Sequence, residues 1–363
     1  MSILWISKRL YMHKDLLSDR FGRYYELPLR LSRSGFDVDM VLFSYRWRHA
    51  ERVRINDHFT IRSYGILGAG AMLLHLLAQA RSDKIQIILG SSDMPYCILA
   101  VLLAKLVGRR CACDIYDNFE TYTSARIPLL LPLFYQALHK TDVIVTFEQT
   151  LSDYLQDAHR VGAICTVPNG VDPTVFRPLD KLDCRRALGL PADVPIVGYF
   201  GSLTKQRGSQ TLFQAFDRIR KAVPDTVFLL AGGVEPEIQL PAHNLKHLGL
   251  LPQQALPQAI CASDVCCIHY SNNDFARFSF PQKMMEYIAC GVPFVAPQIG
   301  GAGRFLADFP YLLYRVDDAQ HMALQTLALL RNPDRPLPPP WTWAQAAESF
   351  NAVLSQVPME PTT

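Results

Sequence analysis

Short apolar runs alternate with amphipathic segments along the first half of the chain. The runs are apolar throughout, which is typical of strands buried on both faces, and the segments between them carry apolar residues at helical spacing. This pattern predicts strands at Ile3–Ile6, Val38–Phe43, Phe59–Ser63, Ile85–Leu89, Arg110–Tyr116 and Val143–Thr146. It predicts helices at Tyr24–Ser34, Pro95–Val107, Pro128–His139 and Thr150–Gln156.

The same alternation starts again after a segment punctuated by Pro168, Pro173 and Pro178. Buried strands separated by helices indicate parallel sheets covered by helices on both faces. We therefore expect an α/β chain with two doubly wound, Rossmann-like domains, whose ligands bind at the carboxyl ends of the strands. Strands of the second domain are predicted at Ile196–Phe200, Thr226–Ala231, Leu245–Leu248, Val265–His269 and Phe294–Ala296.

Composition bounds the number of domains and the cellular compartment that the protein suits. With 363 residues, of which 49% are hydrophobic and 19% charged, the chain is long enough to bury two cores. Its nine cysteines are an odd number without a Cys-x-x-Cys pair, and most lie in apolar runs, which favours a reducing compartment. No apolar run reaches the roughly 18 residues of a membrane span. We expect a cytoplasmic protein, with a peripheral contact at the inner face of a membrane as a further expectation.

Two segments bear on that membrane contact. A net charge of +3 is too small to indicate nucleic acid, but basic side chains follow one predicted strand at Arg46, Arg48, His49, Arg52 and Arg54. This basic cluster is either a solvated loop or a patch for an anionic acceptor such as a lipid-linked diphosphate. The apolar run Leu67–Ala80 is either a buried helix or a segment that touches lipid.

The segment Ser279–Gly301 carries the clearest chemistry. It predicts a short helix that opens at Pro281 and runs, after a glycine, into a buried strand. The amides of Gln282 and Lys283 then lack helical partners at the positive end of the helix dipole, which makes an anion site. Glu286 follows about one turn later, which suits a ligand with phosphate at one end and a hydroxylated sugar at the other. The structural alternative is a helix that only leads into a core strand.

Several blocks of sequence, in order, resemble the retaining glycosyltransferases of family 4. They are Val167–Asp172, Tyr199–Leu203 with Arg207-Gly208, His247–Gly249 with Cys261–Val265, and Ser279–Gly301. The resemblance implies the GT-B architecture, in which two Rossmann-like domains face a cleft. It implies an acceptor-side domain over residues 1–171, a nucleotide-sugar donor domain over 172–340, and a final segment, 341–363, whose helix crosses back to the first domain.

The implied activity is transfer of a sugar from a nucleotide-diphosphate sugar to a glycan or lipid-linked acceptor, with retention of configuration. In such enzymes Glu286 holds the nucleotide ribose, and Arg207 is the catalytic cation that stabilises the leaving diphosphate. The full set of donor-binding residues implied here is Gly201, Ser202, Lys205, Arg207, Leu250, Ser279, Gln282, Lys283 and Glu286. Ser202 stands where the family commonly has an arginine, and Phe278 stands where it often has a first glutamate.

The loop Cys113–Glu120 follows the end of a buried strand, where catalytic loops belong. Related enzymes have a histidine where this chain has Phe119. Asp117 and Glu120 are therefore the candidates for acceptor binding or for taking the acceptor proton. The structural alternative is a solvated loop with a helix cap.

We expect activity without a cofactor or a metal. Asp37-Val38-Asp39 matches the pattern with which the other large glycosyltransferase architecture holds a divalent ion, but it leads into a strand and so lies at the wrong end of it. Two other functions remain open at this stage. One is a nucleotide-sugar epimerase of the same architecture. The other is a non-catalytic partner subunit, in which Phe278, Phe119 and Ser202 have replaced active-site residues of the family.

Overall fold

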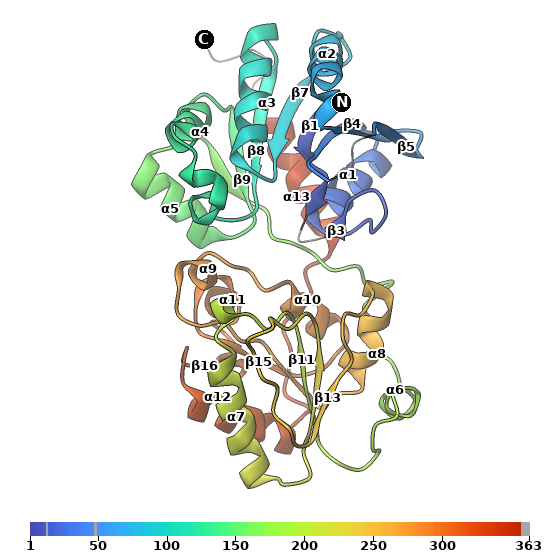
Figure 1. Ribbon diagram of the computed structural model, residues 1–363, viewed down its shortest axis with the longest axis vertical. Helices are drawn as coiled ribbons and strands as arrows, with labels where there is room; N and C mark the ends of the chain where they lie inside the picture. Colours follow the sequence, from blue (N-terminus) through green and yellow to red (C-terminus); the bar gives the residue numbers. More distant parts are fainter. Residues whose placement is uncertain (12–13, 47–48, 357–363) are drawn as a thin grey trace. The chain divides into compact units, whose positions relative to one another are not determined.

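The computed structural model describes residues 1–11, 14–46 and 49–356. They form two compact units (Figure 1). The first holds Met1–Asn169 together with helix α13 (Trp343–Gln356), and the second holds Gly170–Thr342. Arg48 of the basic cluster lies outside the described residues.

The first unit is built on an eight-stranded sheet with the order β10-β9-β8-β7-β1-β4-β6-β5. All neighbouring strands are parallel except the edge pair β5 and β6. The strands are β1 (Ser2–Lys8), β4 (Asp37–Ser44), β5 (Glu51–Asn56), β6 (Phe59–Gly65), β7 (Ile87–Ser91), β8 (Arg110–Ile115), β9 (Val143–Thr146) and β10 (Ile164–Thr166). A separate hairpin joins β2 (Leu10–Tyr11) to β3 (Lys14–Asp15).

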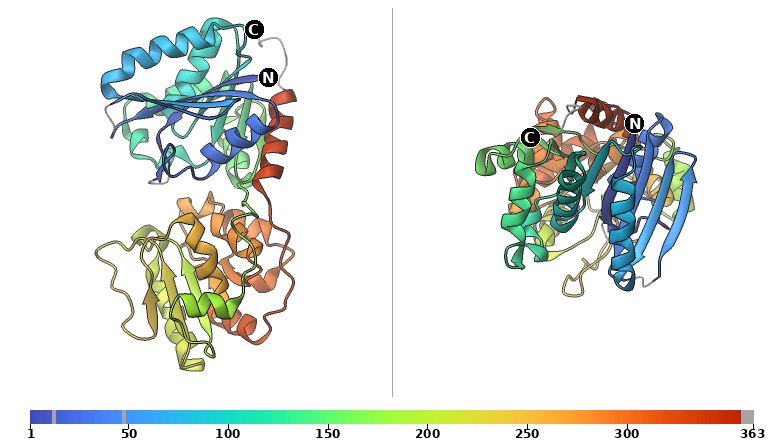
Figure 2. Two further views of the ribbon diagram at one scale, coloured as in Figure 1. Left: turned by 90° about the vertical axis from the view of Figure 1, so that its right-hand side faces the viewer. Right: turned by 90° about the horizontal axis from the view of Figure 1, so that it is seen from above.

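Helices cover both faces of this sheet. Because right-handed crossovers that run in opposite directions place their helices on opposite faces, α1 (Arg23–Arg33) lies with α13 on one face (Figure 2). The other face is covered by α2 (Ala69–Ala80), α3 (Met94–Val107), α4 (Leu130–His139) and α5 (Gln149–His159). Short 3-10 turns are η1 (Ile66–Gly68), η2 (Phe119–Thr121) and η3 (Thr123–Arg126).

The second unit has a six-stranded parallel sheet with the order β13-β12-β11-β14-β15-β16. Its strands are β11 (Ile196–Phe200), β12 (Val227–Ala231), β13 (Leu245–His247), β14 (Val265–Cys267), β15 (Phe294–Pro297) and β16 (Leu313–Tyr314). Its helices are α6 (Lys181–Ala187), α7 (Ser209–Ala222), α8 (Leu256–Cys261), α9 (Asp274–Arg277), α10 (Gln282–Ala289), α11 (Gly300–Phe305) and α12 (Ala319–Arg331), with 3-10 turns η4 (Lys205–Arg207), η5 (Gln253–Ala255) and η6 (Pro310–Leu312).

The prediction of two doubly wound α/β sheets is confirmed, while some local predictions were wrong. The basic cluster is not a simple loop, because Arg52 and Arg54 lie on β5. Their charges suit an edge strand, since they discourage pairing with another chain. Pro281 precedes α10 and does not occupy its first turn. The run Leu67–Ala80 is not a buried helix, because α2 buries only its Met72, Leu76 and Ala80 positions.

Two further findings concern the cysteines and the search for a membrane-spanning helix. All nine cysteines are free thiols, and only Cys165 is not fully buried. Across the described ranges, no helix is both long enough and apolar enough to cross a membrane.

Candidate active site

The loop after β11 places Arg207 at the carboxyl edge of the second sheet. Thr204 begins the 3-10 turn η4, and its Oγ1 accepts a hydrogen bond from the Arg207 amide at 3.3 Å. A side-chain carbon at Gly201 would lie 3.1 Å from a guanidinium nitrogen of Arg207. Glycine at that position therefore lets the guanidinium approach the backbone, where a ligand would also approach.

The backbone carbonyls of this loop are held from the segment after β14. Asn273 Nδ2 donates to Gln206 O at 2.7 Å, and the Ser271 amide donates to Arg207 O at 3.1 Å. His269 Nε2 lies 2.8 Å from Gly208 O. Successive carbonyls are thus fixed from one neighbouring segment, so the loop that carries Arg207 is restrained before any ligand binds.

His269 makes its contact as a neutral ring. Burial lowers the pKa of His269 to about 4. Because Gly208 O can only accept, the single N–H of the neutral ring lies on Nε2. Nδ1 lies 2.8 Å from the Tyr314 hydroxyl, which also lies 3.0 Å from Ile268 O. The sequence analysis missed this residue; a histidine directly after a buried strand at the carboxyl edge was the available signal.

The guanidinium of Arg207 is surrounded by aromatic rings. Its central carbon lies 5.2 Å from the Tyr270 ring centre and 5.8 Å from that of Phe275. In the described part of the chain, no carboxylate forms an ion pair with it. Burial acts to lower the pKa of Arg207, but the phenol oxygens of Tyr270 and Tyr199 raise it above its usual value. A charged, half-buried group without an anionic partner is suited to bind an anion.

Lys283 reaches the same place from helix α10. A hollow at the carboxyl edge is lined by Gly201, Arg207, Tyr270, Lys283 and Tyr287. Lys283 also forms an ion pair with Glu286, whose side chain is almost fully buried. The structure therefore brings together three of the predicted donor-binding residues, Gly201, Arg207 and Lys283, with Glu286 attached to them through Lys283.

The other predicted donor residues are placed differently. Ser279 Oγ donates to Phe275 O, and Gln282 Nε2 donates to Gly170 O at 2.5 Å, so both side chains are engaged with backbone carbonyls. The remaining three, Ser202, Lys205 and Leu250, are exposed and do not line the hollow. Phe278, where relatives often have a glutamate, is a buried core residue.

A glycine fixes the geometry beside α10. Gly300 has φ +54°, and a side-chain carbon there would lie 2.5 Å from Ala276 O and 2.7 Å from Arg277 O. Only glycine allows α11 to start this close to the end of α9. The first turn of α11 is thereby held against the segment that leads into Ser279, whose carbonyl accepts from the Gly301 amide at 3.1 Å.

At the carboxyl edge of the first sheet, Asp117 follows β8. Its Oδ1 accepts from the Asn118 amide at 2.8 Å, and its Oδ2 lies 3.1 Å from the Tyr122 hydroxyl. Burial raises the pKa of Asp117 to about 6, although the Tyr122 hydroxyl, the Asn118 amide and the nearby Lys8 act to lower it. A carboxyl group with a pKa near neutrality can exchange protons at physiological pH.

Lys8, at the end of β1, is a cation that acts on this carboxylate and was missed by the sequence analysis. Its Nζ lies 5.2 Å from the Tyr122 ring centre. Burial lowers the pKa of Lys8, although Asp93 and Asp117 offset part of the effect. The available signal was a lysine at the carboxyl end of a buried strand.

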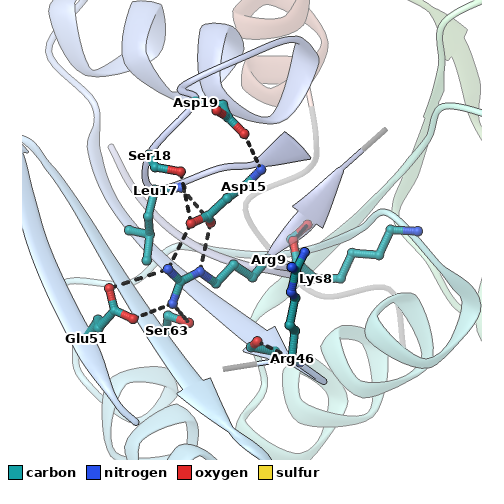
Figure 3. A network of polar contacts seen from close by, with 11 residues as sticks. Lys8, Arg9, Asp15, Leu17, Ser18, Asp19, Arg46, Glu51 and Ser63 are labelled. Atoms are coloured by element: carbon teal, nitrogen blue, oxygen red, sulfur yellow. Dashed lines mark hydrogen bonds and ion pairs between the residues drawn. The ribbon is translucent and has the colours of Figure 1, made fainter. Parts of the chain in front are cut away.

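The neighbouring Arg9 is structural. Its guanidinium binds Asp15 at 2.8 and 2.9 Å and Glu51 at 2.6 Å, and it lies 3.3 Å from Ser63 Oγ (Figure 3). These contacts join the β2–β3 hairpin to β5 and β6. The Lys8 side chain points away from this network (Figure 3).

Glu120 is placed differently from Asp117. Its two carboxylate oxygens accept from the Tyr135 hydroxyl at 2.5 Å and the Tyr154 hydroxyl at 2.7 Å, and Oε1 lies 3.2 Å from His159 Nε2. These partners come from α4 and α5. Phe119 is buried among aromatic rings. The geometry therefore favours Asp117 over Glu120 as the group that meets an acceptor.

Asp37 and Asp39 lie at the amino end of β4, as predicted. Asp37 Oδ1 lies 2.7 Å from His58 Nδ1, and Asp39 pairs with Arg62. Within the described ranges, no group of three or more His, Cys, Asp or Glu side chains is arranged to hold a metal ion.

Because Asp37 and Asp39 already have basic partners away from the carboxyl edge, we expect turnover to survive EDTA. The variant Asp37→Asn with Asp39→Asn should keep kcat within about threefold, as for changes remote from a site. The rate is to be measured per folded protein, because loss of the Arg62 pair will lower stability. Loss of activity in EDTA that manganese or magnesium restores would refute this expectation.

Two family models match successive parts of the chain. The family model described as Glycosyltransferase Family 4 matches residues 23–175, and the model described as Glycosyl transferases group 1 matches residues 194–332. Among curated relatives, a D-inositol 3-phosphate glycosyltransferase of Stackebrandtia nassauensis is 30% identical over 193 residues, which are 48% of this chain and 42% of that protein. The first relatives are thus matched over about half of their length or less.

Solved structures resemble the whole chain. Sucrose-phosphate synthase from Thermosynechococcus elongatus superposes with a TM-score of 0.71 at 18% identity, over 98% of each chain. HepE of Anabaena in complex with UDP-glucose gives a TM-score of 0.66 at 17% identity, over 99% of this chain and 96% of that one. At these identities the likeness shows the fold. The chain thus carries a region that matches Family 4 glycosyltransferases, followed by a region that matches group 1 glycosyl transferases, and it has the fold of the solved GT-B glycosyltransferases.

Proposed function

We propose that this protein is a retaining, metal-independent glycosyltransferase that moves a sugar from a nucleotide-diphosphate sugar to a glycan or lipid-linked acceptor. The observation that carries the proposal is the convergence of Arg207 and Lys283 on one hollow at the carboxyl edge of the second sheet. Ligands of doubly wound sheets bind at this edge. Two cations that approach from different elements match the charge of a diphosphate.

The mechanism assigns separate tasks to the two units. In the second, Arg207 and Lys283 bind the donor diphosphate, and Arg207 stabilises the charge that grows on it as the glycosyl bond breaks. Glu286 accepts hydrogen bonds from the ribose hydroxyls. In the first, Asp117 binds the acceptor hydroxyl and takes its proton. A front-face reaction also allows the departing phosphate to take that proton, so the absent family histidine at Phe119 does not prevent turnover.

The direct test is donor turnover by the purified protein. UDP, GDP, ADP and their sugar conjugates are first screened for thermal stabilisation, since a ligand at 100 times its Kd adds about 2.7 kcal/mol to the free energy of unfolding. The sugar conjugate of the stabilising nucleotide is then incubated with the protein alone. A transferase slowly releases nucleotide diphosphate. An epimerase changes the sugar without releasing it, and a non-catalytic subunit does neither.

Replacing Glu286 by alanine should weaken nucleotide binding about 10- to 150-fold. Loss of a charged hydrogen-bond partner costs about 1.5–3 kcal/mol, and the change also frees Lys283 from its ion pair. Titration calorimetry with the nucleotide gives the Kd. Glu237→Ala, at an exposed glutamate of the same unit, is the matched control. Unchanged affinity in folded Glu286→Ala would remove Glu286 from the site.

A further inference from the structure

The helices on one face of the first sheet carry an unusual outer surface. Most of the large apolar side chains that are exposed in the described residues lie on α2, α3, α4 and the turns before α2 and α4. Leu67 is 85% exposed, Leu129 72% and Leu74 71%. α3 packs against both α2 and α4, so these elements form one continuous layer (Figures 1 and 2).

Helix α2 shows how this surface arises. Ala69–Ala80 contains no Lys, Arg, Asp or Glu, although a surface helix normally carries charged residues on its outer side. Met72, Leu76 and Ala80 face the protein, and Leu74 is exposed. An uncharged, mostly apolar helix that is buried on one side only has an outer face that suits an apolar environment.

The turn before α4 adds an independent observation. Leu129 has φ 67°, in the left-handed region that a leucine rarely adopts. Ile127 in the same turn is also exposed. A strained backbone that presents an apolar side chain to solvent is unexpected unless something covers that side chain.

Within this layer the charged residues are basic, while acidic residues such as Asp83, Asp93 and Asp142 lie at the ends of its helices. Residues 66–82, 94–113 and 121–141 contain no Asp or Glu, and every charged residue in them is Lys or Arg. Lys105 pairs with Asp142 and Arg109 with Asp83. The cations for which the described part of the chain shows no ion pair are exposed at Arg81, Arg126 and Lys140.

We propose that the outer face of α2, α3 and α4 is a docking surface for an anionic lipid bilayer. Leucines that enter the acyl boundary, bordered by cations that meet lipid phosphate, are the combination such a surface needs. A protein interface would be expected to carry aromatic residues at its centre, whereas the most exposed side chains here are leucines. The inference rests on the proposed function in one respect, since it selects the lipid-linked class of acceptor.

The test is co-sedimentation of the full chain with vesicles of phosphatidylcholine alone or mixed with phosphatidylglycerol. Wild type should bind the anionic vesicles at least tenfold more strongly than the neutral ones, and salt should weaken this binding. Leu74→Gln with Leu102→Gln, at exposed leucines of α2 and α3, should lower binding at least tenfold, because each leucine loses its transfer into hydrocarbon. Leu182→Gln with Leu324→Gln, at exposed helical leucines of the second unit, is the matched control and should bind as wild type does.

Three results would overturn the proposal: no binding to either vesicle, equal binding to both, or equal losses in the two double variants. A dimer in sedimentation velocity that Leu74→Gln with Leu102→Gln dissociates would also overturn it, because the surface would then belong to a second copy. Release of nucleotide diphosphate from the sugar conjugate selected by the nucleotide screen, measured on the same samples, separates the two claims. If a protein that does not bind vesicles still releases nucleotide diphosphate, the docking surface is refuted and the proposed function stands.

Discussion

Replacing Arg207 by alanine should lower kcat by about 10²- to 10³-fold, which is the usual loss when one preorganised donor to a developing anion is removed. The expected loss is large because the guanidinium is half-buried and its loop is fixed before the donor arrives. Donor affinity should fall less than kcat, since charge on the diphosphate grows toward the transition state. Steady-state rates of nucleotide diphosphate release give both quantities.

Two further variants make the Arg207 result interpretable. Arg207→Lys keeps the charge but loses the planar fork, so it should recover only part of the rate. Arg186→Ala, at an arginine on α6 whose side chain is 78% exposed, should leave kcat unchanged. If Arg207→Ala raises KM alone, the residue binds the donor uniformly and does not act in catalysis.

The sequence predicted best those strands whose own residues are enough to indicate a strand. The strands β9 and β11 consist almost entirely of apolar residues, as expected for strands buried on both faces, so both were predicted at their observed bounds. The edge strand β5 was missed, because its alternation of basic and apolar residues becomes a strand only by pairing with β6. Its structure depends on a partner that the local sequence does not contain.

The residues of the candidate site also differ in how far the local sequence predicts their positions and contacts. Arg207 follows a recognisable strand and glycine, so its position at the carboxyl edge was predictable. What Glu120 does was not predictable, because Tyr135, Tyr154 and His159 reach it from two later helices. Asp114 is a similar case. It lies at the end of β8, three residues before Asp117, yet it forms a fully buried ion pair with Arg23 at 2.7 Å.

Lys8 and His269 show a further limit. Their roles come from burial, which lowers the pKa of both side chains, and burial is a property of the assembled sheet. A sequence can place a basic residue at the end of a strand, but only the packed structure shows which carbonyl or carboxylate it meets. The carboxyl ends of predicted strands are therefore where sequence analysis should look for charged residues that no motif marks.

Asp117→Asn should lower kcat by about 10²- to 10⁴-fold, the usual contribution of a positioned proton acceptor. Because burial raises the pKa of Asp117 to about 6, the active carboxylate is present above that pH and lost below it. The pH profile of wild-type kcat/KM should therefore have an acid limb near pH 6, and the residual activity of the variant should lack it. Asp157→Asn, at an exposed aspartate on α5, should keep both the rate and the limb.

The pH dependence of the free energy of unfolding gives an independent test of the ionisation of Asp117. A raised pKa means that the folded state binds the proton more tightly than the unfolded state, so ionisation of Asp117 destabilises the fold as pH rises from about 4 to about 6. Asp117→Asn removes this penalty, so its urea midpoint relative to wild type should increase across that window and then stay constant. A variant that is stabilised in this way yet retains full kcat would show that Asp117 is buried as described but takes no proton from the acceptor.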